Sequence, residues 1–180
     1  DVEPLLQRLA GDANRVRTDF TDDLGTVFVD QTELEHIIFN LVANARDAMP
    51  MGGEIVVRAS IEDIAAAPEH AVIVPPPGRY ACIAILDSGH GMTEEVKRRM
   101  FDPFFTQKTG GRGTGLGLIG VRPLVEGAKG GLLVHSSPVG GTRVALYLPL
   151  EEAARPVAPP RRSSPTRTPA FGTPVAWAAL

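Results

Sequence analysis

The segment from Asn40 to Met49 combines an apolar helical face with a polar stripe directly beside it. At about 100° of rotation per residue, the three residues Asn40, Asn44 and Asp47 fall on one narrow stripe of a helix. The apolar arc next to this stripe contains Leu34, Ile37, Ile38, Leu41, Val42, Ala45 and Met49. The segment therefore predicts a long helix with amide and carboxylate groups at the edge of a core. Such a stripe could bind a hydrated cation or order water, and an ordinary solvated helix face gives the same pattern.

Length and composition fit one globular domain with some extra chain. The 180 residues are 43% hydrophobic and carry a net charge of -3, so nothing indicates a basic surface for nucleic acid. The single cysteine, Cys82, excludes an internal disulfide and fits a reducing compartment. No apolar run approaches the roughly 20 residues that span a bilayer, and no signal peptide is visible. We expect a cytoplasmic fragment of a longer protein, which could itself be membrane-anchored.

Hydrophobic periodicity and turn signals predict alternating strands and helices on both sides of this helix. Asp30 or Thr32 caps the long helix, which stops before Pro50. Other helices are predicted over 1–12, 93–100 and 116–126, the last with a kink or early end at Pro123. Strands are predicted over 15–20, 26–29, 54–61, 79–86, 132–136 and 142–148. Loops are predicted over 65–78 and 101–114, and the Pro-, Ala- and Arg-rich residues from 152 onward predict a disordered tail. Phe171 and Trp177 in that tail could form a docking segment or be stray aromatics.

A second polar feature follows the apolar strand predicted over 79–86. Asp87 stands at the strand end, where a half-buried carboxylate accepts hydrogen bonds strongly, and the adenine ring offers an amine donor. Gly89 and Gly91 permit unusual backbone angles and a close ligand approach. An ordinary strand-to-helix turn would use similar residues, so this motif is weak by itself.

A third and a fourth segment follow each other directly. Phe101–Lys108 contains three phenylalanines around Pro103, which suits a rigid hinge of a closing lid or an anchor in the core. Gly110–Leu118 is glycine-rich and leads into a helix, a pattern that binds phosphates through free N–H groups. No G-x-x-x-x-G-K-[ST] motif occurs, and the glycines follow a loop rather than a strand, which excludes a P-loop and a dinucleotide fingerprint.

In this order and spacing, the four segments closely resemble the N, G1, F and G2 boxes of the ATP-binding domain of sensor histidine kinases. The similarity covers roughly residues 1–150 and is greatest to PAS-linked and hybrid kinases. It implies the Bergerat ATP-binding fold, an α/β two-layer sandwich with a mixed, mostly antiparallel sheet and helices packed on one face. It also divides the chain into a connector or end of an upstream dimerisation helix (1–12), the ATP-binding catalytic domain (13–150) and a tail or linker (151–180).

The resemblance implies roles for individual residues. Asn44 would ligate Mg²⁺, Asp87 would bind the adenine amine, and Lys108 would reach the phosphates. The full set of ATP-binding residues implied in this way is Asn40, Asn44, Asp47, Asp87, Gly89, Gly91, Met92, Phe104, Lys108, Gly113, Thr114, Gly115, Leu116, Gly117 and Thr142.

The resemblance also bears on the reaction. Hydrolysing members of the superfamily place a Glu one turn before the Mg²⁺ asparagine, where Asn40 stands here, and an amide cannot act as a general base. We therefore expect ATP-dependent phosphorylation of a histidine rather than hydrolysis. A phospho-acceptor histidine of this family is followed by an acidic residue, with a proline a little further on, and His36, His70, His90 and His135 all lack that context. The acceptor would thus lie on a dimerisation domain of a homodimeric parent and pass phosphate to a response-regulator receiver domain, while the fragment alone would be monomeric. An ATP-sensing module without phosphotransfer is the alternative.

Overall fold

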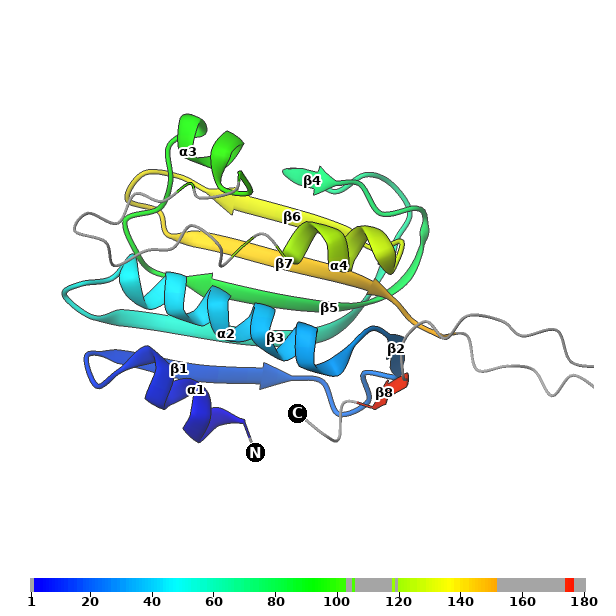
Figure 1. Cartoon of the computed structure of the whole chain (residues 1–180), viewed down its shortest axis with the longest axis horizontal. Coiled ribbons are helices and arrows are strands. Elements are labelled where there is room, and N and C mark those ends of the chain that lie inside the picture. Colours follow the sequence, from blue (N-terminus) through cyan, green and yellow to red (C-terminus); the bar gives the residue numbers. More distant parts are fainter. Residues whose placement is uncertain (1, 103–104, 106–117, 119, 152–173, 177–180) are drawn as a thin grey trace, which may run out of the picture.

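The computed structural model describes residues 2–102, 105, 118, 120–151 and 174–176, and it has two layers (Figure 1). One layer is a six-stranded sheet in the order β1-β3-β5-β7-β6-β4, in which only the β1–β3 pair is parallel. Its strands are β1 Asn14–Phe20, β3 Gly53–Ile64, β4 Ala71–Ile73, β5 Gly78–Asp87, β6 Gly131–Ser136 and β7 Thr142–Pro149. Helices α1 Glu3–Ala10, α2 Gln31–Asp47 and α4 Val121–Gly127 cover one face, and α3 Glu94–Arg99 lies beside the end of β6. This arrangement confirms the predicted fold class.

Helix α2 is the central element of the helical layer. It begins where predicted, because the Asp30 carboxylate accepts a hydrogen bond from the Glu33 N–H at 2.9 Å. All seven residues of the predicted apolar arc are buried in the main core between the helices and the sheet. The long helix and its buried face were therefore predicted correctly. None of the helices within the described residues is long and apolar enough to cross a bilayer.

Helix α4 and the connection over 65–78 differ from the prediction. Helix α4 begins at Val121 instead of Leu116, so Pro123 lies in its first turn, where an N–H would have no intrahelical partner. The expected kink at Pro123 therefore does not arise. The predicted loop over 65–78 contains the strand β4, which pairs with β6 at Leu132 and Leu133 and forms one edge of the sheet.

The end of β7 and the tail meet at a short strand, β2 Thr26–Phe28. Val27 forms a bridge with Leu150, and the Glu151 N–H donates to the Thr26 carbonyl at 2.9 Å. Strand β8, Pro174–Ala176, pairs antiparallel with β2 as a separate two-stranded sheet. The expectation of a tail without regular structure does not hold for these three residues, and 152–173 and 177–180 lie outside the described residues.

The sheet face opposite the main core carries a second apolar cluster around Tyr80, Cys82 and Tyr147. The Tyr80 hydroxyl donates to the Pro76 carbonyl at 2.6 Å, which ties the 65–77 connection to this face. Burial raises the pKa of the Cys82 thiol to about 12. At neutral pH this cysteine is therefore a protonated core residue and a poor nucleophile.

The cap of α2 gives a first test. Replacing Asp30 with Ala removes the acceptor for the Glu33 N–H, so we expect a loss of about 1 kcal/mol in the free energy of unfolding, measured by urea denaturation. Asp30→Ser keeps a side-chain oxygen at this position and serves as the matched control. An equal loss in both variants would show that the hydrogen bond is not what the helix end requires.

Candidate functional site

The site predicted from Asp87 is built at the end of the central strand β5. The Asp87 Oδ1 accepts the Gly89 N–H at 2.8 Å and the Thr142 N–H at 3.2 Å, so β5, its following loop and β7 all fix the carboxylate. Burial raises the pKa of Asp87, while these two hydrogen bonds and the nearby His90 act in the opposite direction. Among the described residues both of these hydrogen bonds go to Oδ1, which leaves Oδ2 available to an amine donor from a ligand.

The glycines after Asp87 are required by close packing. A Cβ on Gly89 would lie 2.8 Å from both the Cβ and the carbonyl oxygen of Ala48, at the end of α2. Gly91 has a φ of 66°, and a Cβ there would overlap the Ser137 carbonyl oxygen. The loop therefore lies tightly between α2 and the β6–β7 turn, and the two glycines predicted to shape the pocket sit against opposite walls.

The polar stripe of α2 extends towards the start of the helix from the contact between Ala48 and the loop after Asp87. The His90 N–H donates to the Ala48 carbonyl at 3.2 Å, and Asn44 lies one helical turn before Ala48. Asn40 lies one further turn back on the same face; it is exposed, whereas Asn44 is half-buried. The fold therefore arranges Asn40, Asn44 and the Asp87 loop along one edge of the helical layer.

Asp47, the third residue of the polar stripe, forms an ion pair that the sequence did not suggest. Its Oδ1 pairs with the Arg46 guanidinium at 2.8 Å, and Arg46 also donates to the Leu9 carbonyl at 3.1 Å. Leu9 lies in the last turn of α1, so Arg46 supplies a donor to a helix end whose carbonyls lack intrahelical partners. Asp47 thus orients the side chain that ties α1 to α2.

Ser136 is a site residue that sequence reasoning missed. Its hydroxyl accepts the Met92 N–H at 2.9 Å, donates to the Gly141 carbonyl at 3.0 Å and lies 2.9 Å from the Thr142 hydroxyl. Because Ser136 has one hydroxyl proton, which goes to Gly141, the Thr142 hydroxyl is the donor between the two. The available signal was a small polar residue paired with Thr142 across the β6–β7 hairpin.

The remaining predicted residues belong to the F box and the glycine loop. Phe104, Lys108 and Gly113–Gly117 lie outside the described residues. Phe101 packs against the main core, which agrees with a core anchor at the start of this segment. The Arg99 guanidinium lies 4.5 Å from the centre of the Phe105 ring, so α3 also contacts the segment.

The donor groups present fit magnesium better than a transition metal. Among the described residues, no group of three or more His, Cys, Asp or Glu side chains could hold a metal ion. Mg²⁺ takes few protein ligands, keeps several waters and uses phosphate oxygens for the rest. A half-buried amide such as Asn44 suits an ion that arrives with a nucleotide.

Comparison with known proteins decides the family. A family model described as histidine kinase-, DNA gyrase B- and HSP90-like ATPase matches residues 29–152. The chain belongs to this ATPase family. The match confirms the resemblance carried by the four sequence segments and includes Asp87, Thr142 and the polar stripe of α2.

Several relatives of this ATPase domain are sensor kinases. It is 37% identical over 150 residues to the sensor kinase CckA of Brucella abortus, which covers 83% of the chain and 16% of the relative. It is 31% identical over 155 residues to sporulation kinase E of Bacillus subtilis, covering 86% and 19%. The mycobacterial sensor histidine kinase MprB has a similar structure, with a TM-score of 0.60, 26% identity and coverage of 82% of this chain and 88% of that one. The chain thus spans less than a fifth of these two curated relatives.

The raised pKa of Asp87 predicts how stability depends on pH. The folded state holds the Asp87 proton more tightly than the unfolded state, so stability falls as pH rises from the ordinary carboxyl pKa of 3.8 through the raised value. Asp87→Asn keeps an oxygen acceptor without the charge, so we expect a higher free energy of unfolding than wild type at neutral pH. That advantage should disappear at acid pH in urea titrations over a pH series.

A contrasting variant isolates the acceptor. Asp87→Ala leaves the Gly89 and Thr142 N–H groups without their partner and is expected to be less stable than Asp87→Asn at every pH. An Asp87→Asn advantage that stayed the same from neutral to acid pH would contradict the assignment of the burial cost to the Asp87 charge.

Proposed function

We propose that this chain is the ATP-binding catalytic domain of a two-component sensor histidine kinase. It binds Mg·ATP and transfers the γ-phosphate to a histidine on a separate dimerisation domain, from which the phosphate passes to an aspartate of a response-regulator receiver domain. The observation that carries the proposal is the position of Asp87. Its half-buried carboxylate is held by two backbone N–H groups at the edge where the polar stripe of α2 ends.

Asp87 supports recognition of adenine. The carboxylate oxygen Oδ2 would accept from the exocyclic amine, while Thr142 donates its N–H to Oδ1 and has its hydroxyl in the Ser136 network. A hydrogen bond to a charged group contributes about 1.5–3 kcal/mol, and guanine has a carbonyl where adenine has this amine. Asp87 therefore favours ATP over GTP.

Asn44 supports the phosphate end of the site. Its amide oxygen would ligate the Mg²⁺ that neutralises charge on the phosphates, with Asn40 lining the same region. Lys108 and the Gly113–Gly117 loop, which lie outside the described residues, would enclose the phosphates from the other side. The protein then contributes position and charge to the reaction rather than a covalent intermediate.

Asn40 supports transfer over hydrolysis. An incoming histidine nitrogen brings its own lone pair to the γ-phosphorus, the bond to the β–γ bridging oxygen breaks, and ADP leaves with that electron pair. Water attacks efficiently only when a base removes its proton, and the Asn40 amide cannot do so. The domain therefore needs an acceptor histidine from its partner domain. We also propose that the parent kinase is a cytoplasmic homodimer and that the domain by itself is monomeric.

Transfer can be measured with γ-labelled Mg·ATP and a separately purified dimerisation domain that carries an acceptor histidine. We expect label on that histidine with the wild-type chain and at least a tenfold loss with Asn44→Ala, because one hydrogen-bonding or ligand group contributes roughly 1.4 kcal/mol or more. Gln31→Ala, an amide on the same helix that bonds Glu35, is the matched control and should leave transfer unchanged.

The outcomes separate the functions. Nucleotide binding without transfer to any acceptor would support the ATP-sensing module, and rapid phosphate release without an acceptor would support a hydrolase. Equal transfer by wild type and Asn44→Ala would contradict the role given to Asn44.

The position of Asn40 gives a further test. Asn40→Glu places a carboxylate one turn before Asn44, where it can accept a proton from water. We expect acceptor-free phosphate release to rise above the wild-type rate, because general-base catalysis contributes 10²–10⁴-fold in favourable geometry. Asn40→Gln keeps the length without the base and should show no rise. An equal rise in both variants would exclude base catalysis as the cause.

A further inference from the structure

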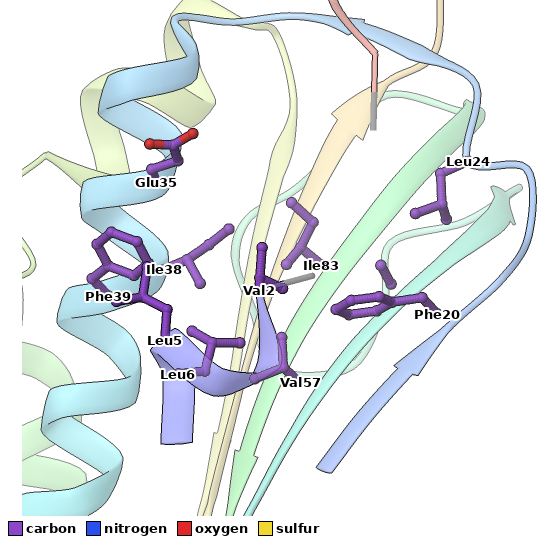
Figure 2. A pocket seen from close by; sticks show the side chains of 11 residues that line it. Val2, Leu5, Leu6, Phe20, Leu24, Glu35, Ile38, Phe39, Val57 and Ile83 are labelled. Carbon is purple, nitrogen blue, oxygen red and sulfur yellow. The ribbon is translucent and has the colours of Figure 1, made fainter. Parts of the chain in front are cut away.

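An apolar pocket lies away from the nucleotide site, between α1, α2 and the sheet (Figure 2). Its volume is about 270 Å³, and all but one of the residues that line it are apolar. Helices α1 and α2 supply one side with Leu5, Leu6, Ile38 and Phe39, and Phe20 and Leu24 lie on the other side. Leu5 and Phe20 are each 45% exposed. Apolar side chains gathered in this way favour an occupant.

We propose that the pocket holds the C-terminal segment of the chain, residues 177–180, with the Trp177 indole as its anchor. The proposal concerns residues outside the described part of the chain and rests on three observations within it. These are the path of β8, the shortness of the β2–β8 pair, and the chemistry of the pocket lining. It does not depend on the nucleotide chemistry.

The path of β8 leads to the pocket. Strand β8 runs antiparallel to β2, with Ala176 opposite Thr26 and Pro174 opposite Phe28. At Ala176 the direction of β8 therefore points past Thr26 towards Leu24, which is a pocket residue. Residues advance about 3.3 Å each in an extended chain, so Trp177 needs no long linker to reach the pocket edge.

The β2–β8 pair also calls for an additional anchor. Each strand has only three residues, and Pro174 has no N–H to donate. An isolated two-stranded pair is marginal in water. A large side chain buried next to β8 would supply the apolar area that three paired residues lack, since an aromatic ring buries 150–250 Å².

The lining matches an indole. A cavity of about 150 Å³ can hold a benzene ring, so about 270 Å³ leaves space for the larger indole. A buried indole N–H requires an acceptor, and Glu35 provides the one carboxylate of the lining. Glu35 already accepts from the Gln31 side chain at 2.9 Å, and a carboxylate has capacity for further donors. Residues 177–180 are Trp, Ala, Ala and Leu, so no side chain of this segment brings a charge into an apolar site.

Fluorescence tests the proposal directly, because Trp177 is the only tryptophan of the chain. We expect its emission in the whole chain to be blue-shifted and protected from iodide quenching, compared with N-acetyl-tryptophanamide in the same buffer. Phe20→Glu and Leu5→Glu place charge on opposite sides of the pocket, and each should shift the emission to the red and remove the protection. Val72→Glu, at an exposed valine on β4, is the matched control and should leave the emission unchanged.

Each other outcome overturns the proposal. A solvent-exposed emission in the wild-type chain, or a blue shift that neither pocket variant changes, would show that Trp177 does not occupy the pocket. A blue shift that grows with protein concentration would place the indole on a second copy. Circular dichroism and a cooperative urea transition show whether each variant is folded.

Discussion

The site depends on the contact between the end of α2 and the loop after β5. The Ala48 carbonyl lies at the helix end, where carbonyls lack intrahelical partners, and it accepts the His90 N–H at 3.2 Å. Gly89 has no room for a side chain against Ala48. Helix and strand are thereby held at one separation, which places the Asn44 side of α2 next to Asp87. A rotation of α2 by one residue would turn the polar stripe by about 100° and remove it from this edge.

The opposite wall relies on Ser136, which links the Met92 backbone, the Gly141 carbonyl and the Thr142 hydroxyl. The same hairpin presents the Thr142 N–H to Asp87. The Ser136 hydrogen bonds are possible because the β6–β7 register pairs Ser136 with Thr142. The raised pKa of Asp87 shows that the fold bears a cost in keeping this carboxylate partly buried. A ligand amine that bonds Oδ2 would offset part of that cost, so ligand binding and stability are coupled at one side chain.

Local signals predicted the part of the site that local sequence determines. The periodicity of α2 and its Asp30 cap act within a few residues, and the structure bears them out. Gly89 and Gly91 lie where the packing leaves no room for a side chain, and Gly91 has the positive φ that glycine permits. Strand β4, the Ser136 network and the Arg46 bridge to Leu9 depend on partners distant in the chain, so no local pattern could reveal them. The kink or early end predicted at Pro123 was wrong because the prediction began this helix at Leu116, whereas α4 begins at Val121. At its observed place in the first turn, proline is compatible with the helix.

The solvent exposure of the polar stripe of α2 bears on whether the proposed site favours phosphotransfer or hydrolysis. Asn40 is exposed and Asn44 is only half-buried, so the proposed phosphate end faces away from the core. A hydrolase needs a base and an ordered water at this end, whereas a kinase needs space for an incoming side chain. The exposure of the stripe leaves room for such a side chain, and the Asn40 amide supplies no base. In the proposed kinase these two features would act together, because ATP would be kept until a histidine arrives.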